Sequence, residues 1–555
     1  MRGPPILGRE MRKAGVGVVA VLVALAAANA ASATVSAHVA AGKLTVTGDK
    51  RVNHITLRLQ RGNRGRLQVV VDGAVRSTFA RRRFKAIVVN AGRGNDVVRI
   101  DQGRGAFTDA ERTTLSGGAG NDVLVGGKGA EKLLGGAGAD SITGNGGADA
   151  VALGTGADAF TWDPGDGNDA VDGNAGFDRI TVDGSAAGES FDLAPNGARL
   201  RLTRDVGAVA LDLTRLERVD VAARGGDDRL AVHDLTSVPA AVNADLGTGG
   251  ADRVTVDGTE GDSTMIVSGN ASLLTLTGLA AQLTIAHGSA VDGLTVNALG
   301  GADTLDASAY AGRVSLTVDA GTGNDAITGG GGNDVVLLGT GDDAFTWNPG
   351  GGSDIVEGQI GLDTARVNGS AANESFTLSA NGARLAVGRG LDSTLLDANS
   401  VEHVAAFPLG GADTIAAHTL TGTGVTALNV DFGPADGLVN QLVVDGTAGD
   451  DVVTIAGSGD DLSAAGLAAS VAVTHAAPDD LLRVNALAGD DVVQAQSLSA
   501  GVLLLTEDGG DGDDVLVGSA GADTIFGGAG DDVLIGGPAF DVLDGGTGSN
   551  IVIQD

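Results

Sequence analysis

The chain has 555 residues, of which 92 are glycine and 3% are aromatic, and its formal net charge is −34 at pH 7. So few large side chains argue against thick globular cores and favour many thin layers of small residues. The hydrophobic content of 43% is too high for a typical disordered chain. The absence of cysteine excludes disulfides and thiolate metal sites, and the acidity favours cations over nucleic acid as partners.

The first 33 residues have the pattern of an export signal. Four basic residues between positions 2 and 13 precede an apolar run at 14–28 and small residues that suit cleavage after Ala30 or Ala33. An uncleaved membrane anchor is the alternative, but it needs about 18 to 20 apolar residues. We therefore predict a secreted chain, extracellular or associated with a bacterial cell surface, with no transmembrane segment after cleavage. Met11 is an alternative start.

Residues 51–112 reverse the acidity of the chain, with fourteen Lys and Arg against five acids. One interpretation is a solvated module that caps and complements the acidic body. The other is an anchor to anionic cell-wall polymers or lipid headgroups.

A nine-residue repeat begins at Gly117 with the segments "GGAGNDVLV", "GGKGAEKLL" and "GGAGADSIT". Its sixth place holds an acid at each step through Asp158, and the same register returns in two later blocks. Chance does not keep a nine-residue register through three separate blocks. The sixth-place residues in these blocks are Asp122, Glu131, Asp140, Asp149 and Asp158; Asp325, Asp334 and Asp343; and Asp514, Asp523, Asp532 and Asp541, with Asn550 next in phase.

A longer duplication overlies the short repeat, because residues 140–228 match residues 325–413 at an offset of 185. Between the blocks lies a weaker unit, seen five times, that opens with an apolar strand ending in glycine. It closes some 44 to 48 residues later on a Gly-rich turn and an acid, as at Asp96. Period-two alternation and β-branched residues favour short strands in these units, which we expect to continue the same solenoid.

The nonapeptide combines a tight turn with a short strand. Gly-Gly-x-Gly-x-Asp tolerates positive φ and close backbone approach, and the last three residues form a strand whose central side chain points inward. Two nonapeptides make one coil, so residues eighteen apart stack at about 4.8 Å. The predicted fold is all-β: a parallel β-roll or β-helix solenoid, built from nonapeptide blocks and longer strand modules, with very little helix.

Stacked carboxylates repel one another unless a cation lies between them. Calcium suits such a gap because it takes six to eight oxygens at about 2.3 to 2.6 Å, whereas magnesium prefers a smaller shell and zinc prefers nitrogen or sulfur. A metal-free β-solenoid with Asp-Gly turns is the alternative.

The segments "GGAGNDVLV" and "GGAGDDVLI" (527–535) resemble the calcium-binding nonapeptide of the RTX, or hemolysin-type, repeat family. The resemblance implies a repeat-only secreted protein that binds roughly six to ten calcium ions, with the acids as side-chain ligands and the turn glycines as carbonyl donors. The implied acids are Asp122, Asp140, Asp149, Asp158, Asp169, Asp178, Asp325, Asp334, Asp343, Asp354, Asp363, Asp514, Asp523, Asp532 and Asp541. The implied carbonyl donors are Gly118, Gly120, Gly136, Gly138, Gly321, Gly323, Gly330, Gly332, Gly528 and Gly530. Glu131 and Lys132 depart from the pattern, and Asn550 offers a neutral oxygen that suits a cap.

The two tryptophans, Trp162 and Trp347, lie at matched positions of the duplication. In both copies the acids jump eleven residues at this point before the nine-residue spacing resumes. We interpret the jump as a break in the eighteen-residue stacking, where tryptophan seals the end of a calcium-loaded stack; a sugar-stacking role is the alternative.

Known catalytic motifs such as G-x-S-x-G and H-E-x-x-H do not occur. We therefore expect a non-enzymatic structural, envelope-associated or adhesive protein whose folding depends on calcium. The alternatives are an accessory chain or enzyme with an unrecognised hydrolytic site, and an ice- or surface-binding adhesin. The expected organisation is a signal peptide (1–33), an Arg-rich β module (34–112), calcium block 1 (113–182), two β modules (183–311), calcium block 2 (312–367), two β modules (368–500), and calcium block 3 with a C-terminal cap (501–555).

Overall fold

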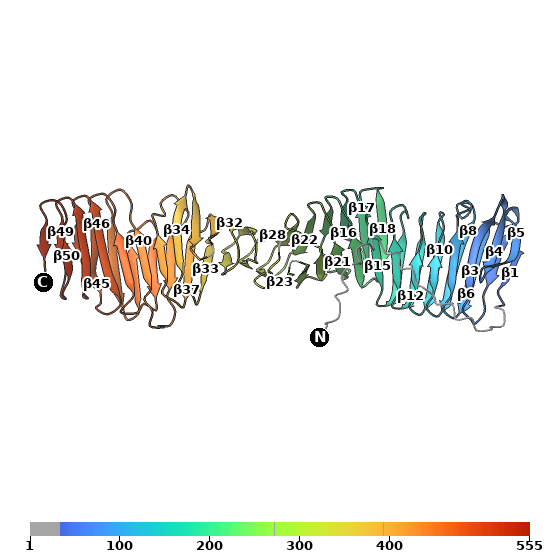
Figure 1. Ribbon diagram of the computed structural model, residues 1–555, viewed down its shortest axis with the longest axis horizontal. Coiled ribbons are helices and arrows are strands. Elements are labelled where there is room, and N and C mark those ends of the chain that lie inside the picture. Colours follow the sequence, from blue (N-terminus) through green and yellow to red (C-terminus); the bar gives the residue numbers. More distant parts are fainter. Residues whose placement is uncertain (1–33, 271, 313, 392, 555) are drawn as a thin grey trace, which may run out of the picture.

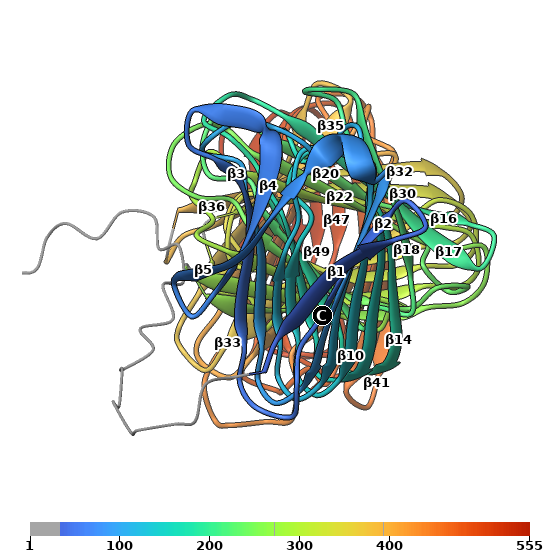
Figure 2. The ribbon, with the colours of Figure 1, turned by 90° about the vertical axis from the view of Figure 1, so that its right-hand side faces the viewer.

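The computed structural model describes residues 34–270, 272–312, 314–391 and 393–554. The predicted signal peptide lies outside these residues. The chain winds into a long rod, with β1 to β5 at one end and β49 to β51 at the other (Figure 1). Viewed along the rod, successive coils lie behind one another and the strands form two sheets (Figure 2).

Sheet A has 25 strands and runs the length of the rod. Its spatial order is β1 (Ser36–Ala40), β2 (Lys43–Thr47), β6 (Ala86–Arg93), β8 (Arg112–Ala119), β10 (Glu131–Ala137), β12 (Ala150–Gly156), β14 (Ala170–Gly176), β18 (Val209–Thr214), β17 (Arg199–Arg204), β16 (Ser190–Asn196), β20 (Arg229–Val232), β22 (Arg253–Thr259), β26 (Gly293–Leu299), β28 (Ser315–Asp319), β30 (Val335–Thr340), β32 (Asp354–Ile360), β36 (Thr394–Asn399), β35 (Arg384–Arg389), β34 (Ser375–Asn381), β38 (Thr414–Ala417), β40 (Gln441–Asp445), β44 (Leu481–Asn485), β46 (Leu504–Asp511), β48 (Asp523–Ala529) and β50 (Val542–Asp544).

Sheet B faces sheet A across the core and is equally continuous. Its spatial order is β5 (Ala74–Ala80), β4 (Asn63–Val71), β3 (His54–Gln60), β7 (Val97–Asp101), β9 (Val123–Val125), β11 (Ser141–Thr143), β13 (Ala159–Trp162), β15 (Arg179–Asp183), β19 (Arg218–Ala222), β21 (Ala241–Asp245), β25 (Leu283–Ala286), β24 (Leu273–Thr277), β23 (Thr264–Asn270), β27 (Thr304–Asp306), β29 (Ala326–Thr328), β31 (Ala344–Trp347), β33 (Thr364–Ser370), β37 (His403–Leu409), β39 (Ala427–Asp431), β43 (Ser470–Thr474), β42 (Asp461–Ala465), β41 (Val452–Ser458), β45 (Val492–Leu498), β47 (Val515–Val517), β49 (Val533–Ile535) and β51 (Ile551–Ile553).

Each coil in the nonapeptide blocks contributes one strand to each sheet, and the shortest of these, with three residues, lie in sheet B. The pairing of β9 with β11 sets Val123 beside Ser141, an eighteen-residue step, and the strands run parallel. The central residues Leu124 and Ile142 point inward and are fully buried. One inward side chain per three-residue strand gives the thin core that the small side chains predict.

The five longer modules continue the solenoid by adding an antiparallel hairpin to one sheet. Three of them place it in sheet B (β3 to β5, β23 to β25 and β41 to β43), and two place it in sheet A (β16 to β18 and β34 to β36). In the duplicated pair, Gly197 and Gly382 open the two-residue hairpin turns with φ of 65° and 66°. Glycine is favoured there because two-residue hairpin turns require positive φ.

The predicted fold class is confirmed: the chain is an all-β parallel solenoid. Within the described ranges, the helical structure is one short 3-10 turn, Arg81–Arg83. No helix in those ranges is long and apolar enough to cross a membrane.

Candidate metal-binding edges

The acids of the repeats form a column along each edge of the solenoid. We call the edge where the chain passes from sheet A to sheet B the AB edge, and the opposite one the BA edge. On the AB edge, the main-chain N–H of Asp122 donates to Oδ1 of Asp140 at 2.7 Å, and that of Asp140 donates to Oδ1 of Asp158 at 2.7 Å. In the third block, Asp514 donates to Asp532 in the same way at 3.0 Å. Acids eighteen residues apart therefore stack.

The tryptophan loops lengthen a coil without breaking these columns, so the expected break in stacking is wrong. The N–H of Asp149 donates to Oδ1 of Asp169 at 2.8 Å, and that of Asp158 donates to Oδ1 of Asp178 at 2.9 Å. Both steps are twenty residues, and the second copy of the duplication repeats them. The two added residues lie in the loop between β13 and β14, outside the paired strands.

Both tryptophans belong to the core. Trp162 and Trp347 are 0% and 1% exposed, and their Nε1–H groups donate to the carbonyls of Gly167 and Gly352 at 2.9 and 3.1 Å. The hydrogen bond closes the extended loop onto the ring. A buried ring has no free face for a sugar, so this geometry supports a packing role.

The second carboxylate oxygen of most column acids is buried and has no hydrogen-bond partner. Among the predicted ligands, this holds for Oδ2 of Asp122, Asp140, Asp149, Asp158, Asp169, Asp178, Asp325, Asp343, Asp354, Asp363, Asp514 and Asp532. It also holds for five acids that close the longer modules, namely Asp96, Asp228, Asp303, Asp413 and Asp491. Buried polar atoms are normally satisfied, so a column of unsatisfied anionic oxygens indicates a missing positive partner.

Three predicted acids differ because the protein itself supplies a donor. Oδ2 of Asp334 accepts the N–H of Gly330 at 2.9 Å, and Oδ2 of Asp523 accepts the N–H of Ser519 at 2.6 Å. Oδ2 of Asp541 accepts the side-chain amide of Gln554 at 2.8 Å. These three carboxylates therefore need a bound cation less than the other column acids do.

The two departures from the repeat pattern still occupy column positions. The N–H of Glu131 donates to Oδ1 of Asp149 at 2.7 Å, and Oε1 of Glu131 is buried without a partner. At the C-terminal end, Oδ1 of Asn550 accepts the N–H of Asp532 at 2.8 Å, and its amide nitrogen donates to the carbonyl of Gly545. The neutral amide of Asn550 thus replaces the second carboxylate oxygen with a hydrogen-bond donor, which the Gly545 carbonyl accepts.

Glycine at the first place of the turn leaves space for converging oxygens. A Cβ on Gly509 would overlap with Oδ2 of Asp514 and lie 2.6 Å from the carbonyl oxygen of Gly527 on the next coil. A Cβ on Gly527 would likewise overlap with Oδ2 of Asp532 and lie 2.8 Å from the carbonyl oxygen of Gly545. These two turns therefore contain a small cradle between their own carboxylate and a carbonyl of the following coil.

The predicted carbonyl donors lie at the second and fourth places of the turns and, apart from Gly330, have positive φ. Two of these carbonyls also take part in the pairing of coils: Gly321 accepts the N–H of Thr340 at 2.9 Å, and Gly528 accepts that of Thr547 at 2.7 Å. The first-place carbonyls, which face the carboxylates, were missed by the sequence reasoning. The recurring first glycine was their signal, since its missing Cβ makes the cradle.

The residues present fit a hard cation bound by oxygen. No group of three or more His, Asp or Glu side chains gathers around one point in the described residues. A cation at these edges would therefore take one carboxylate oxygen per turn and complete its shell with main-chain carbonyls, a ligand set that calcium accepts.

Burial in the columns raises the pKa values of the carboxyl groups. Desolvation, reinforced by neighbouring carboxylates, raises the pKa of Asp122 to about 7, that of Asp149 to about 9, and that of Asp169 to about 7. In the second copy, the pKa of Asp354 also rises to about 7. The charged form is disfavoured wherever no cation compensates it.

These shifts predict that the calcium-free protein loses stability as pH rises. The folded pKa values lie above the unfolded value of about 3.9, so the folded state binds more protons. This stabilisation is complete below about pH 4 and is lost as pH rises through about 6 to 9. We expect thermal melting in the presence of a chelator to give a lower Tm at pH 8.5 than at pH 5. A higher Tm at pH 8.5 would contradict the shifts.

At two turns, an arginine side chain of the protein itself neutralises the buried acid. Glu189 occupies a BA column position, where its N–H donates to Oδ1 of Asp228 at 2.8 Å, and its carboxylate is paired with the guanidinium of Arg204. Arg204 lies 5.6 Å from the centre of the Trp162 ring. The second copy repeats this with Glu374 and Arg389, 3.5 Å apart. All four ionic side chains are at most 3% exposed.

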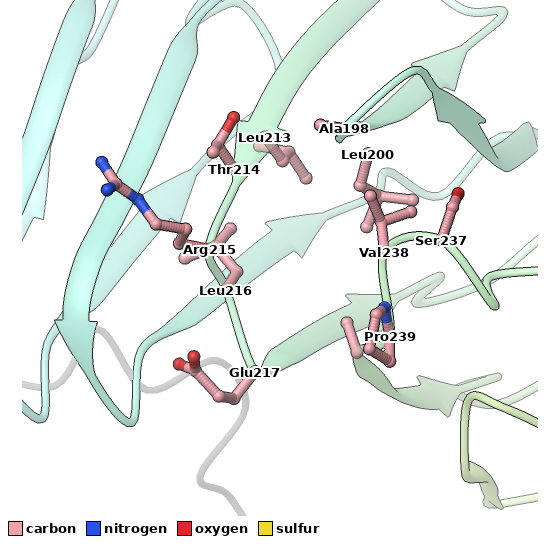
Figure 3. A pocket seen from close by; sticks show the side chains of 11 residues that line it. Ala198, Leu200, Leu213, Thr214, Arg215, Leu216, Glu217, Ser237, Val238 and Pro239 are labelled. Atoms are coloured by element: carbon pink, nitrogen blue, oxygen red, sulfur yellow. The ribbon is translucent and has the colours of Figure 1, made fainter.

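A cavity of about 220 Å³ lies between β17, β18 and the loop at 235–240 (Figure 3). Its two charged side chains are already engaged. Arg215 pairs with Asp172, and Glu217 accepts the N–H of Asp178 at 2.6 Å. Aliphatic groups make up most of the remaining wall, so the cavity adds no reactive pair.

The surface histidines repeat with the duplication. Nδ1 of His233 lies 2.7 Å from Oδ2 of Asp257, and Nδ1 of His418 lies 2.8 Å from Oδ2 of Asp445. Matched pairs in both copies are the pattern of a repeated architecture.

The fold and its edges define a class: a parallel β-roll solenoid with buried acid columns along both sides. Comparison with family models identifies the repeat: the chain carries RTX calcium-binding nonapeptide repeats. They match at residues 109–141, 125–160, 164–185, 317–345, 508–543 and 531–553. Matches fall in each of the three predicted blocks, although the second ends at residue 345, before Asp354 and Asp363. The resemblance seen in the sequence is confirmed.

Among solved structures, the chain is similar to the extracellular lipase LipA from Serratia marcescens, at 15% identity and a TM-score of 0.15. The match covers 56% of this chain and 42% of the lipase, so the chain spans less than half the length of that protein. A superposition this poor carries no argument about activity. No curated protein matches the chain.

Proposed function

We propose that the protein is a secreted calcium-binding β-solenoid that folds when calcium occupies its edges. The observation that carries this proposal is the column of buried, unpartnered Oδ2 atoms, as at Asp122, Asp140 and Asp158. A cation at each cradle supplies the missing partner and relieves the repulsion between stacked carboxylates.

The predicted acids would act as side-chain ligands, with Asp334, Asp523 and Asp541 the weakest because protein donors already engage them. Carbonyls of the turn glycines and of the first-place residues would complete the shell. Calcium fits better than magnesium, since it accepts six to eight oxygens with irregular geometry. We propose that the chain binds roughly six to ten ions.

The test is calcium-dependent folding. The protein is depleted with a chelator and titrated with calcium while circular dichroism records strand content, and magnesium serves as the control. We expect strand signal to rise with calcium and to respond much less to magnesium. A spectrum that does not change on calcium addition after chelation would overturn the proposal.

We further propose a structural, envelope-associated or adhesive role. The two continuous sheets make a stiff rod that holds its ends far apart (Figure 1). The basic module forms one end, where Arg61, Arg64 and Arg66 are exposed beside the outer strand β5. An exposed basic end on an acidic rod suits an anionic surface polymer.

Sedimentation with purified bacterial cell walls tests this role. We expect R61Q/R64Q/R66Q to sediment less than the unaltered protein, and added salt to release the protein. The control R179Q/R229Q/R253Q removes equal charge from exposed positions elsewhere on the rod. Equal sedimentation of both variants would exclude an anchor at the basic end.

A further inference from the structure

A groove of about 1040 Å³ lies along the BA edge at the first nonapeptide block. Its two walls are the longer connections after β7 and β13, at residues 102–111 and 163–169. Between them, the connections after β9 and β11, at residues 126–130 and 144–149, are short nonapeptide turns. The hollow arises because two short turns lie between two longer loops.

Polar contacts fix both walls of this groove to its floor. Oγ1 of Thr108 in the first wall accepts the main-chain N–H groups of Lys128 and Gly129 at 3.2 and 3.1 Å. In the second wall, Gly167 forms a parallel β-bridge with Gly147 of the floor. A groove that is held open in this way needs little reordering to bind a ligand.

Two cationic side chains line the groove, Arg99 on β7 and Lys128 on the turn after β9. Both are exposed, and neither side chain has a hydrogen bond or ion pair among the residues that the structure describes. Asp101 and Asp166 also line the groove, and one oxygen of each accepts a main-chain N–H of its own segment at 2.9 Å. The groove therefore offers positive charge for an anion and carboxylate oxygens for hydroxyl donors.

The second copy of the duplication fills the corresponding space with its own chain. There the connection between β27 and β28 is longer than the one between β9 and β10, and it carries Tyr310, which is 2% exposed. The N–H of Gly331, which matches Gly146 at the offset of 185, donates to the carbonyl of Tyr310 at 2.7 Å. The open space is thus a feature of the first copy, and the repeat itself does not require it.

An acidic oligosaccharide fits this lining better than a peptide or a nucleic acid does. Its carboxylate can pair with Arg99 and Lys128, and its hydroxyls can bond to Asp101, Asp166 and Thr56. A peptide would gain most from a free strand edge, but β9 is paired on both sides, with β7 and β11. A nucleic acid would bring one negative charge per phosphate to a chain of net charge −34.

We propose that this groove binds an acidic oligosaccharide, with Arg99 and Lys128 holding its carboxylate. The site adds a specific sugar contact to the proposed envelope-associated role. It does not use the exposed arginines of the basic end, Arg61, Arg64 and Arg66, none of which lines the groove. The variant R61Q/R64Q/R66Q should therefore keep its affinity for the sugar, which separates a failure of the groove from a failure of the basic end.

Two variants test the groove in different ways. R99Q/K128Q removes its cations, and R112Q/K132Q is the matched control, because it removes equal charge from exposed positions of the same block in sheet A. G146L fills the floor of the groove. A Cβ on Gly146 meets its nearest atoms at 3.5 Å or more, and the φ of this residue lies outside the left-handed region, so leucine fits without strain.

Isothermal titration calorimetry in calcium-containing buffer measures the binding of trigalacturonate, with maltotriose as the neutral sugar and hexaglutamate as the acidic peptide. We expect only trigalacturonate to bind. R99Q/K128Q and G146L should each weaken its binding by about tenfold or more, and R112Q/K132Q by less than about twofold.

The other outcomes each contradict a part of the proposal. Equal binding of maltotriose would overturn the role of the cations, and equal or tighter binding of hexaglutamate would overturn the choice of a sugar. No binding of trigalacturonate, or a loss of its binding in R61Q/R64Q/R66Q, would overturn the groove as its site.

Hydrogen exchange of the unaltered chain gives a readout that does not depend on the folding of a variant. We expect trigalacturonate to slow exchange at residues 145–147 and 164–167. The matching residues 330–332 and 349–352 should not respond, because Tyr310 fills the space there. Equal slowing in both copies, or slowing in neither, would overturn the proposal.

Discussion

Removing calcium should destabilise the protein by roughly 8 to 14 kcal/mol, enough to unfold it at room temperature. If calcium is present at about ten times a Kd of roughly 0.1 mM, each site contributes about 1.4 kcal/mol. Six to ten sites together contribute roughly 8 to 14 kcal/mol, as much as the whole stability of an ordinary domain. We therefore expect a cooperative melting transition in calcium and none above room temperature in a chelator at neutral pH.

Differential scanning calorimetry with calcium, and after exchange into a chelator, measures the difference. Magnesium at the same ionic strength separates site binding from general screening of the net charge of −34. Equal Tm values in calcium and in chelator would mean that the unpartnered carboxylates are tolerated without a cation.

Replacing Arg204 or Arg389 by methionine should destabilise the protein by about 3 to 5 kcal/mol, because it leaves a buried glutamate without its cation. Methionine keeps most of the aliphatic packing, so the loss of stability measures the effect of removing the positive charge. Urea unfolding followed by tryptophan fluorescence detects it locally, since each arginine lies within 5.6 Å of the ring centre of one of the two tryptophans.

The control is R215M, which removes an exposed ion pair with Asp172 and should change stability by about 0 to 1 kcal/mol. R204M/E189M removes both charges and should recover much of the loss. An R204M variant as stable as R215M would show that the buried pair adds nothing.

The nine-residue register was sufficient to predict the coil, the stacked acids and the parallel solenoid. The register predicts these features because the core is only one side chain deep. Close packing then requires each coil to repeat the position of the previous one. The pairing of Val123 with Ser141 and the stacking of Asp122 on Asp140 follow directly from the period.

The period failed where a loop could absorb extra residues. The jump from Asp158 to Asp169 looked like a break in register, but the added residues bulge outside the strands and the Trp162 ring closes the loop. The hairpins of the longer modules were hidden for the same reason, because an antiparallel excursion within a sheet leaves the coil position unchanged.

Residue type alone does not show which acids keep an unpartnered oxygen. Asp523 and Asp334 keep the repeat pattern, yet turn N–H groups occupy their second oxygens. Asp491 departs from the pattern through Leu487, yet its second oxygen is buried and unpartnered. The two cases differ in backbone geometry, which residue identity does not reveal.

The central claim is that the edges hold calcium in the folded protein, and native mass spectrometry counts the ions directly. Protein folded in calcium should carry roughly six or more ions, and these should leave together as the charge-state distribution shifts to that of an extended chain after chelation. A folded protein with the same mass and charge states before and after chelation would contradict the claim.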